Sequence, residues 1–184
     1  MSITDQKAAL RKGLIGARPP EQPTAAQYDF MAQRLREKLP AGAFQITAYL
    51  PIRRELDPLP LIERLCAFPV ALPRTPREPG PLDFRLWSRG DTLDEGLFKT
   101  LEPCDTAPKL EAQSVVVLLP LVGFDRSLFR LGYGGGFYDR YIKRVKKNKK
   151  IITIGLAYSF QKVKKIQTNN NDMKLNFIIT NKKD

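Results

Sequence analysis

The chain has 184 residues, a length that suits one domain, and 31 Lys and Arg against 19 Asp and Glu give it a net charge of +12. It contains no histidine, which excludes Ser-His-Asp and Cys-His catalysis and HExxH zinc sites. Its two cysteines, Cys66 and Cys104, cannot supply a four-ligand zinc site by themselves. We therefore expect free, buried thiols in a reducing compartment.

The sequence shows no sign of membrane insertion. Residues 1–7 lack the apolar core of a signal peptide, and the longest apolar run, 115–124, is about half a membrane span. Hydrophobic residues make up 42% of the chain and charged residues 27%, which is enough to bury a core. We expect a soluble, cytoplasmic protein that does not bind membranes.

Two helices are predicted near the N-terminus. Ser2 and Asp5 have capping-box spacing ahead of a helix-forming run over 6–12. After a proline-rich loop, a second helix is predicted over about residues 25–39. Its apolar stripe is approximated by Ala26, Phe30, Leu35 and Leu39.

Short elements follow. Residues 44–50 alternate apolar and polar side chains, which predicts a strand. Further along the chain we expect a loop over 51–60 that contains Glu55, a short helix over 61–68, and short strands over 69–72 and 82–87.

Three segments lack polar alternation, as strands covered on both faces do. They are 115–119, 151–157 and, shorter, 177–180. Because such strands alternate with helices, we predict a single α/β domain over 1–184, with a mostly parallel sheet flanked by helices in a Rossmann-like, three-layer arrangement.

The positive charge lies mainly at the C-terminal end. Residues 143–184 hold 12 of the basic residues and only two acidic ones, Asp172 and Asp184. All 15 prolines lie at or before Pro120, and every asparagine lies at or after Asn148. Residues 143–184 are therefore a compositionally distinct, Lys- and Asn-rich part of the chain.

A glycine-rich segment carries the clearest chemical signal. Gly132-Tyr-Gly-Gly-Gly136 has four glycines in five positions, so successive backbone N–H groups can point at one anion. A helical pattern follows it, with Tyr138, Tyr141, Ile142 and Val145 on one face. The segment is neither a Walker A loop nor a GxGxxG motif. Its position indicates a phosphate at a helix N-terminus.

Asp139 adds a second condition. In the first helical turn its carboxylate would repel a nearby phosphate unless a cation lay between them. Mg²⁺ resolves the conflict, because it binds one or two carboxylates together with substrate phosphates. Two readings stay open at this point: a nucleotide phosphate with Mg²⁺, and a structural glycine turn followed by a carboxylate that caps the helix.

The segment Arg130 to Arg140, with Leu119 to Asp125 before it, closely resembles the motif of the 5-formyltetrahydrofolate cyclo-ligase family, also called methenyltetrahydrofolate synthetases. Other segments resemble elements of that family in the same order. They are Lys7 to Arg11, Tyr49 to Glu55, Leu72 to Arg74, Gly155 to Gln161, and Asp172 with Ile178 to Thr180. The resemblance covers about residues 7–180.

The resemblance implies an enzyme that converts 5-formyltetrahydrofolate to 5,10-methenyltetrahydrofolate with ATP and Mg²⁺ and releases ADP and phosphate. The residues that match ATP-binding positions are Lys7, Arg11, Arg130, Gly132, Tyr133, Gly134, Gly135, Gly136, Phe137 and Tyr138. Those that match folate-binding positions are Leu50, Glu55, Gly134, Gly136 and Tyr138. Asp139 and Asp172 match the Mg²⁺ ligands. The implied partners are ATP and the folate, with or without a polyglutamate tail, and the expected state is a monomer.

The basic stretch leaves other functions open. Residues 143–150 carry six basic residues, and a nucleic-acid-binding protein could use 143–165 for phosphate contacts. No aromatic residue interleaves with the basic ones over 143–150, so a solvated helix face, or a field that attracts anionic substrates, is favoured over nucleic-acid binding. A further alternative is a non-catalytic family member that binds folate or nucleotide.

Overall fold

In the computed structural model, which describes residues 3–67, 69–78 and 80–183, a six-stranded sheet forms the centre, in the order β10-β9-β6-β1-β2-β3. The strands are β1 (Gln45–Thr47), β2 (Val70–Arg74), β3 (Asp83–Trp87), β6 (Ser114–Pro120), β9 (Lys150–Ala157) and β10 (Phe177–Thr180). β3 pairs antiparallel with β2, and the other neighbouring pairs are parallel. The predicted α/β class and mostly parallel sheet are confirmed.

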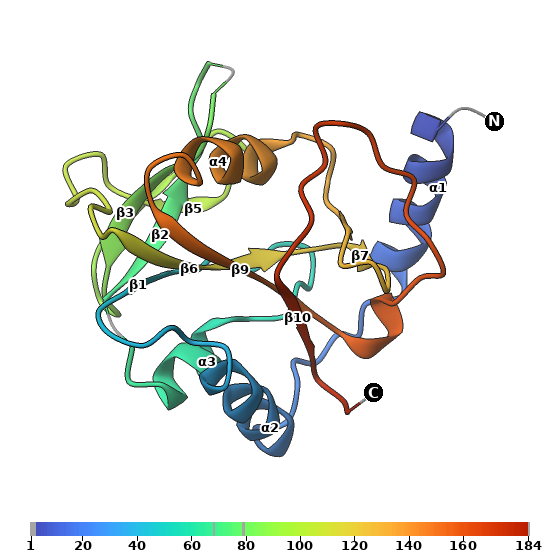
Figure 1. Cartoon of the computed structure of the whole chain (residues 1–184), viewed down its shortest axis with the longest axis horizontal. Coiled ribbons are helices and arrows are strands. Elements are labelled where there is room, and N and C mark those ends of the chain that lie inside the picture. The colour runs from blue at the N-terminus through green and yellow to red at the C-terminus, as the bar shows by residue number, and fades with distance from the viewer. Residues whose placement is uncertain (1–2, 68, 79, 184) are drawn as a thin grey trace.

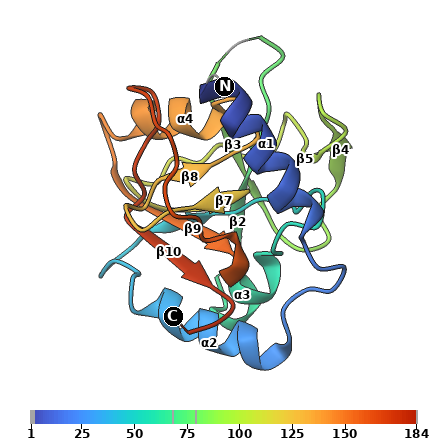
Figure 2. The same cartoon turned by 90° about the vertical axis from the view of Figure 1, so that its right-hand side faces the viewer.

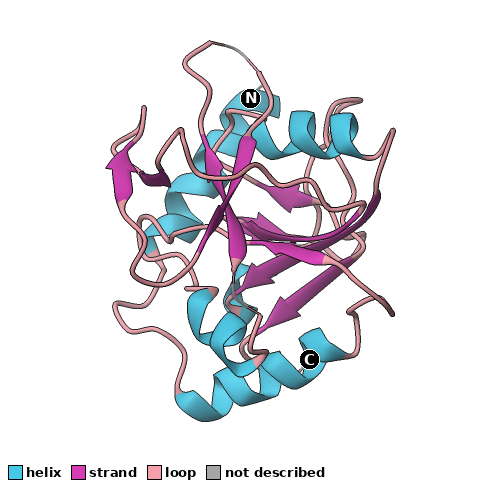
Figure 3. Cartoon of the chain, turned by 90° about the vertical axis from the view of Figure 1, so that its left-hand side faces the viewer, coloured by secondary structure: helices cyan, strands magenta, loops and turns pink. Residues whose placement is uncertain are grey.

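Helices cover both faces of this sheet (Figures 1 and 3). α2 (Ala25–Arg36) and α3 (Leu59–Arg64) lie on one face, and α4 (Phe137–Val145) lies on the other. α1 (Ile3–Gly16) lies beside the short ribbon of β7 (Gly123–Phe124) and β8 (Arg130–Leu131) (Figure 2). No helix in the described ranges combines the length and the apolar character that a membrane crossing requires.

Strand β6 shows why the sheet must be covered on both faces. Val116 and Leu118 pack in the cluster that includes α2 and α3, whereas Val115, Val117 and Leu119 pack against α4. All five side chains are at most 1% exposed, and each such burial contributes about 2 kcal/mol. The absence of polar alternation in the sequence follows directly from this two-sided burial.

Two small ribbons were not predicted. β4 (Leu93–Glu95) pairs with β5 (Leu101–Pro103), and β7 (Gly123–Phe124) pairs with β8 (Arg130–Leu131). Strands of two or three residues are too short to show a periodic pattern. The β7–β8 ribbon matters for the site, because it joins the end of β6 to the glycine-rich segment.

The second predicted helix is wrong at its C-terminal end, and its apolar stripe is only partly confirmed, since Leu35 is buried and Phe30 and Leu39 pack against the core. α2 ends at Arg36, and its buried residues are Tyr28, Met31, Ala32 and Leu35. Ala26 is exposed and Phe30 is only partly buried. Thr24 sets the register, because it forms a capping box with Gln27 at the start of the helix.

Other boundaries also differ from the predictions. β1 is shorter than 44–50 and is covered on both faces, because the expected outward residues Thr47 and Tyr49 are buried. α3 covers 59–64 rather than 61–68. The thiols are free as expected, but they are not buried: Cys66 is exposed and Cys104 partly so. The predicted cap at Ser2 and the end of the third helix at Phe68 lie outside the described residues.

Candidate functional site

The glycine-rich segment forms a loop that leads into the first turn of α4. Gly134 and Gly136 have φ of +107° and +64°, and Gly136 is the N-cap of the helix. A Cβ on Gly135 would lie 2.6 Å from the Phe137 ring, so a side chain at this position would displace that ring. The loop therefore exposes backbone at a helix N-terminus, which is the arrangement that favours an anion.

Helix α1 brings two cations to this loop. The Arg11 Nε donates a hydrogen bond to the Gly132 carbonyl at 2.7 Å. Leu10 and Leu14 pack in a small apolar cluster with Val122 and Leu131, which fixes the face of α1 that meets the loop. Lys7 lies one turn before Arg11 and is also partly buried. The predicted pair of phosphate-binding cations is thus brought to one side of the loop.

Asp139 lies in the first turn of α4, as predicted. Its Oδ2 accepts a hydrogen bond from Arg130 Nη2 at 2.8 Å, and its Oδ1 accepts one from the Met173 N–H at 3.0 Å. Arg130 comes from β8 and its side chain is 6% exposed. Asp139 therefore ties α4 both to the β7–β8 ribbon and to the loop before β10.

Asp172 immediately precedes Met173, so this hydrogen bond also brings the second predicted metal ligand to Asp139. The Asp172 Oδ2 lies 2.9 Å from Lys7 Nζ and accepts a hydrogen bond from the Asn169 N–H. No group of three or more metal-binding side chains occurs among the described residues. Two carboxylates fit Mg²⁺ when substrate phosphates supply further oxygens, so these residues suit a metal that binds together with a nucleotide.

Glu55 lies in a tight turn after β1. Arg53 and Arg54 both have positive φ, 48° and 58°, and such strain is commonly found at functional sites. Glu55 is 2% exposed, and its Oε2 accepts a hydrogen bond from the Ile52 N–H at 3.1 Å. Burial raises the pKa of Glu55 to about 7, although this hydrogen bond and the charge of Arg18 act in the opposite direction.

Three tyrosines lie close to the Glu55 carboxyl: Tyr133, Tyr138 and Tyr49. Burial, with a contribution from the Glu55 charge, raises the pKa of Tyr138 and of Tyr49 well above the usual value. The Tyr49 hydroxyl donates to the Leu56 carbonyl at 2.7 Å, whereas the Tyr138 hydroxyl is buried without a hydrogen-bond partner in the described structure. Leu50, at the end of the same segment, is partly buried against the core.

Buried polar atoms without hydrogen-bond partners gather at this place. In the described part of the chain they include Glu55 Oε1, Tyr138 Oη, Arg130 Nη1 and Arg18 Nε. Tyr138 links the group, because the charges of both Glu55 and Arg130 act on its hydroxyl. Native proteins leave few such atoms unpaired, so this run from Glu55 to Arg130 fits the polar groups of a ligand.

Sequence reasoning missed two residues of this site, Arg18 and Arg53. Arg18 is 3% exposed and contacts Tyr133 and Glu55, and the guanidinium of Arg53 lies 5.5 Å from the centre of the Tyr133 ring. Neither arginine belongs to a periodic pattern or to the glycine segment. The Arg-Arg pair before Glu55 was the one available signal, since consecutive bulky residues in a tight turn are strained.

The lysines of the basic stretch face mainly solvent. Lys143, Lys146 and Lys147 are exposed, and Val145 is buried in the core, as predicted for a solvated helix face. Lys149 Nζ donates to the Leu110 carbonyl at 3.3 Å.

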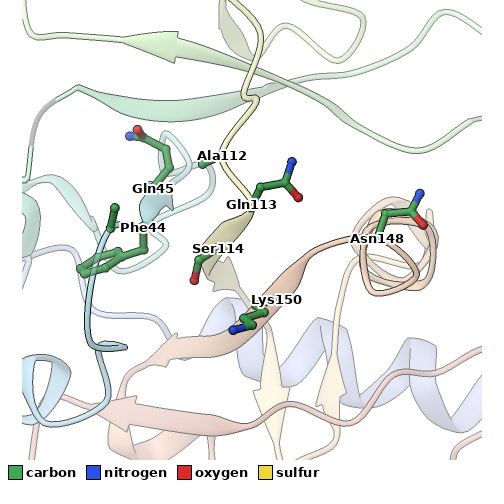
Figure 4. A pocket seen from close by; sticks show the side chains of 8 residues that line it. Phe44, Gln45, Ala112, Gln113, Ser114, Asn148 and Lys150 are labelled. Carbon is green, nitrogen blue, oxygen red and sulfur yellow. The ribbon is translucent and has the colours of Figure 1, made fainter.

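A surface groove lies at the opposite edge of the sheet (Figure 4). Phe44 and Gln45 of the β1 end, Gln113 and Ser114 of the β6 end, and Lys150 of the β9 end line it. These are the amino ends of the parallel strands, whereas the loop 132–136 and Glu55 lie beyond carboxyl ends. Ligands of open α/β sheets bind at the carboxyl ends, so the groove is separate from the candidate site.

The chain is similar to known proteins over most of its length. Residues 3–181 match the 5-formyltetrahydrofolate cyclo-ligase family. The chain is 33% identical over 148 residues to the 5-formyltetrahydrofolate cyclo-ligase of Escherichia coli K12, which covers 75% of this chain and 78% of that protein. It is 43% identical over 75 residues to the Haemophilus influenzae protein of the same name, covering 37% of this chain and 40% of that protein. The alignment to Haemophilus influenzae thus spans less than half of that relative.

Two solved structures share the fold. The chain superposes on 5,10-methenyltetrahydrofolate synthetase from Aquifex aeolicus with a TM-score of 0.71 and 26% identity, covering 96% of this chain and 90% of that one. It superposes on the synthetase from Mycoplasma pneumoniae with a TM-score of 0.66 and 24% identity, covering 96% and 99% of the two chains. The similarity therefore extends over nearly the whole fold.

Proposed function

Since the chain belongs to the 5-formyltetrahydrofolate cyclo-ligase family, we propose that it converts 5-formyltetrahydrofolate to 5,10-methenyltetrahydrofolate with ATP and Mg²⁺. The formyl oxygen is a poor leaving group. Transfer of the γ-phosphoryl group of ATP to this oxygen releases ADP and makes it a good one. N10 then attacks the formyl carbon, the carbon–oxygen bond breaks, and phosphate and the N10 proton leave. Such chemistry depends mainly on positioning and charge neutralisation, and it needs no histidine.

The observation that carries the proposal is the run of unpaired buried polar atoms between Glu55 and Arg130. Leaving such atoms without partners costs about 1–3 kcal/mol each. The cost is recovered when a ligand supplies complementary groups. The run begins at a buried carboxylate and ends beside the glycine loop, which agrees with a folate that extends toward a nucleotide phosphate.

On the nucleotide side, Lys7, Arg11 and Arg130 would bind the phosphates together with the N–H groups of the loop 132–136. Bound Mg²⁺ would neutralise charge on the transferring phosphoryl group, with Asp139 and Asp172 holding it. Each carboxylate is paired with a cation, Asp139 with Arg130 and Asp172 with Lys7. The cations are therefore held in place before the phosphates arrive, which lowers the ordering cost of binding.

On the folate side, Glu55 would accept hydrogen bonds from N–H groups of the pterin ring, and Leu50 and Tyr138 would contact the ring itself. The pKa of Glu55 near 7 means that the carboxylate is half ionised at neutral pH. Hydrogen bonds to an ionised acceptor are the stronger ones, so folate affinity is expected to rise as the pH increases through 7.

We also infer a monomeric protein of the reducing cytoplasm. Both cysteines are free thiols, which is typical of a reducing compartment. The folate with and without a polyglutamate tail is a candidate substrate, because nothing in the proposed roles of Leu50, Glu55 and Tyr138 involves the tail.

The test is to mix the purified protein with 5-formyltetrahydrofolate and MgATP and to follow the near-ultraviolet absorption of the methenyl product. Product formation that requires both ATP and Mg²⁺ supports the proposal. No product, with an active cyclo-ligase as positive control, refutes it. Calorimetric binding of the folate without product would instead indicate a non-catalytic family member. Salt-dependent binding of oligonucleotides that is lost when the lysines of 143–150 are replaced would favour the nucleic-acid alternative.

A further inference from the structure

We propose that Arg18 is a positioning residue that holds the glycine loop and the Glu55 turn at the spacing that the two substrates require. This inference rests on the proposed function. It concerns a buried cation in the connection between α1 and α2, which lies outside the motifs that indicated the site.

Arg18 joins three separate segments. Its side chain is fully buried, at 0% exposure. The Nη1 group donates to the Arg53 carbonyl at 2.8 Å and to the Tyr133 hydroxyl at 2.7 Å, and Nη2 donates to the Leu121 carbonyl at 3.1 Å. One guanidinium thus connects the end of β6, the turn before Glu55 and the glycine loop.

Tyr133 is the contact on the nucleotide side. It lies between Gly132 and Gly134, so the position of its ring sets the position of the loop backbone. The guanidinium carbons of Arg18 and Arg53 lie 5.8 and 5.5 Å from the ring centre, within range for cation–π attraction. The loop is therefore held from both the α1–α2 connection and the strained turn.

Glu55 is the contact on the folate side. Arg18 Nη2 lies 3.9 Å from Glu55 Oε1, close enough for charge attraction but too far for a hydrogen bond. Arg18 Nε and Glu55 Oε1 both lack hydrogen-bond partners within the described residues. A guanidinium that served packing alone would be expected to have all its donors paired. The unpaired Arg18 Nε therefore favours a role in arranging the site for its substrates.

Spacing between these segments matters for the reaction. The formyl oxygen must lie within reacting distance of the γ-phosphorus, and the two substrates are held by different segments. An error of about 1 Å in such an arrangement can lower the rate by about 100-fold. A residue that fixes the distance between the two segments therefore acts mainly on kcat, whereas a residue that binds one substrate acts mainly on its KM.

Arg18 also acts on the charge of Glu55. The charged or titratable groups that face Glu55 are Arg18, Arg53, Tyr133, Tyr138 and Tyr49. Arg18 and Arg53 favour the ionised carboxyl, whereas burial opposes it. Replacing the guanidinium, whose Nη2 lies 3.9 Å from Glu55 Oε1, weakens the favourable part, so the pH at which folate affinity rises is expected to move upward.

The experiment uses Arg18→Lys, which keeps a positive charge but loses the fork of donors. The matched control is Arg64→Lys. Arg64 also joins several segments, through Asp29, Pro60 and Ala25, but it lies on the α2–α3 face away from the site. Kd for MgATP, Kd for the folate as a function of pH, kcat and the denaturation midpoint are measured for each protein.

We expect Arg18→Lys to bind MgATP within about threefold of the unaltered protein, to lose about 100-fold in kcat, and to show an upward shift in the pH dependence of folate binding. Arg64→Lys should change only the denaturation midpoint. Unchanged kcat and pH dependence in Arg18→Lys overturns the proposal, as does a loss of activity that merely parallels unfolding. If Arg18→Lys does not fold, Tyr133→Phe keeps the ring but removes the hydroxyl that accepts from Arg18 and faces Glu55, and it must lower kcat by a larger factor than it weakens MgATP binding.

The outcomes are distinct from those of the function test. If the unaltered protein forms no product, the proposed function fails, and the Arg18 proposal is then decided by the pH dependence of folate binding alone. If the unaltered protein forms product and Arg18→Lys matches it in kcat and pH dependence, the proposed function stands and the Arg18 proposal fails.

Discussion

Replacing Glu55 with Gln removes a buried carboxyl while keeping its size. The pKa of Glu55 is about 7 in the folded protein against 4.5 in the reference state, so the folded state holds the proton more tightly than the unfolded state. The stability contributed by the protonated group is therefore present at low pH and is lost as the pH rises through 7. The separation of the two pKa values corresponds to about 3 kcal/mol, at ~1.36 kcal/mol per pKa unit.

The Gln variant carries no charge at any of these pH values. We therefore expect Glu55→Gln to be more stable than the unaltered protein at pH 8.5 by up to about 3 kcal/mol, and to differ little from it at pH 4.5. The Gln side-chain oxygen can still accept the hydrogen bond that Ile52 now donates to Glu55 Oε2. Urea denaturation at the two pH values measures this difference.

A buried glutamate with different surroundings provides the control. Glu102 is 4% exposed, but its Oε1 accepts hydrogen bonds from the Thr75 N–H and the Thr100 hydroxyl, both at 3.1 Å. Glu102→Gln replaces a charged acceptor of two hydrogen bonds and is expected to destabilise the protein at pH 8.5. If Glu55→Gln brings no gain at pH 8.5, or the same gain at both pH values, the reasoning about Glu55 is refuted. The gain is expected together with weaker folate binding, because functional sites keep groups that cost stability.

Three further substitutions test the site. Asp139→Asn should keep the hydrogen bond from Met173 yet lower Mg²⁺-supported turnover by about 100-fold. The control Asp29→Asn, on an exposed face of α2, should leave turnover unchanged. Equal turnover in both variants would remove Asp139 from the site. Tyr138→Phe removes a buried, unpaired hydroxyl, so the free energy of unfolding should rise by about 1 kcal/mol in thermal unfolding. Calorimetry should show weaker folate binding. A loss of stability would mean that the hydroxyl has a partner. Gly136→Ala places a Cβ at φ +64° and should cost about 1 kcal/mol and weaken MgATP binding, whereas unchanged affinity would show that the loop geometry is not needed for the nucleotide.

The parts of the fold that the sequence predicted correctly depend on local patterns. Strands β6, β9 and β10 are apolar without alternation because both of their faces are covered, and no distant information is needed to see this. The start of α4 after the glycines is equally local, since Gly136 is its N-cap. The short ribbons β4–β5 and β7–β8 were not predicted for the opposite reason. The strand geometry of two or three residues is determined by the partner strand rather than by their own sequence.

The failures in α2 and β1 have a different cause. The predicted α2 stripe used Ala26 and Phe30, but the capping box at Thr24 and the tertiary contacts turn Tyr28 and Met31 to the core. In β1 the alternation of polar and apolar residues suggested one exposed face, yet Thr47 is fully buried. A threonine is small enough to be buried between neighbouring strands, so polarity alone does not determine the outward side.

The candidate site depends on contacts between distant segments, which local patterns in the sequence do not show. The motif segments named Asp139, Asp172, Lys7 and Glu55 as candidates. They could not show the ion pair between Lys7 and Asp172, because it joins α1 to the loop before β10 across most of the chain. Arg18 was missed altogether. It carries no local signal, since its importance comes only from the three segments that meet around it.

The net positive charge of the chain is distributed differently in the C-terminal part and in the candidate site. Most of the excess lies in residues 143–184, and Lys143, Lys146 and Lys147 are exposed to solvent. At the proposed Mg²⁺ position the charges balance pair by pair, because Lys7 pairs with Asp172 and Arg130 with Asp139, while Arg11 adds a further cation beside the loop. A nucleotide alone would have to compete with both carboxylates, and a metal ion alone would have to compete with both cations. A nucleotide and a metal together can replace both sets of partners at once, so this balance favours MgATP over either of its components.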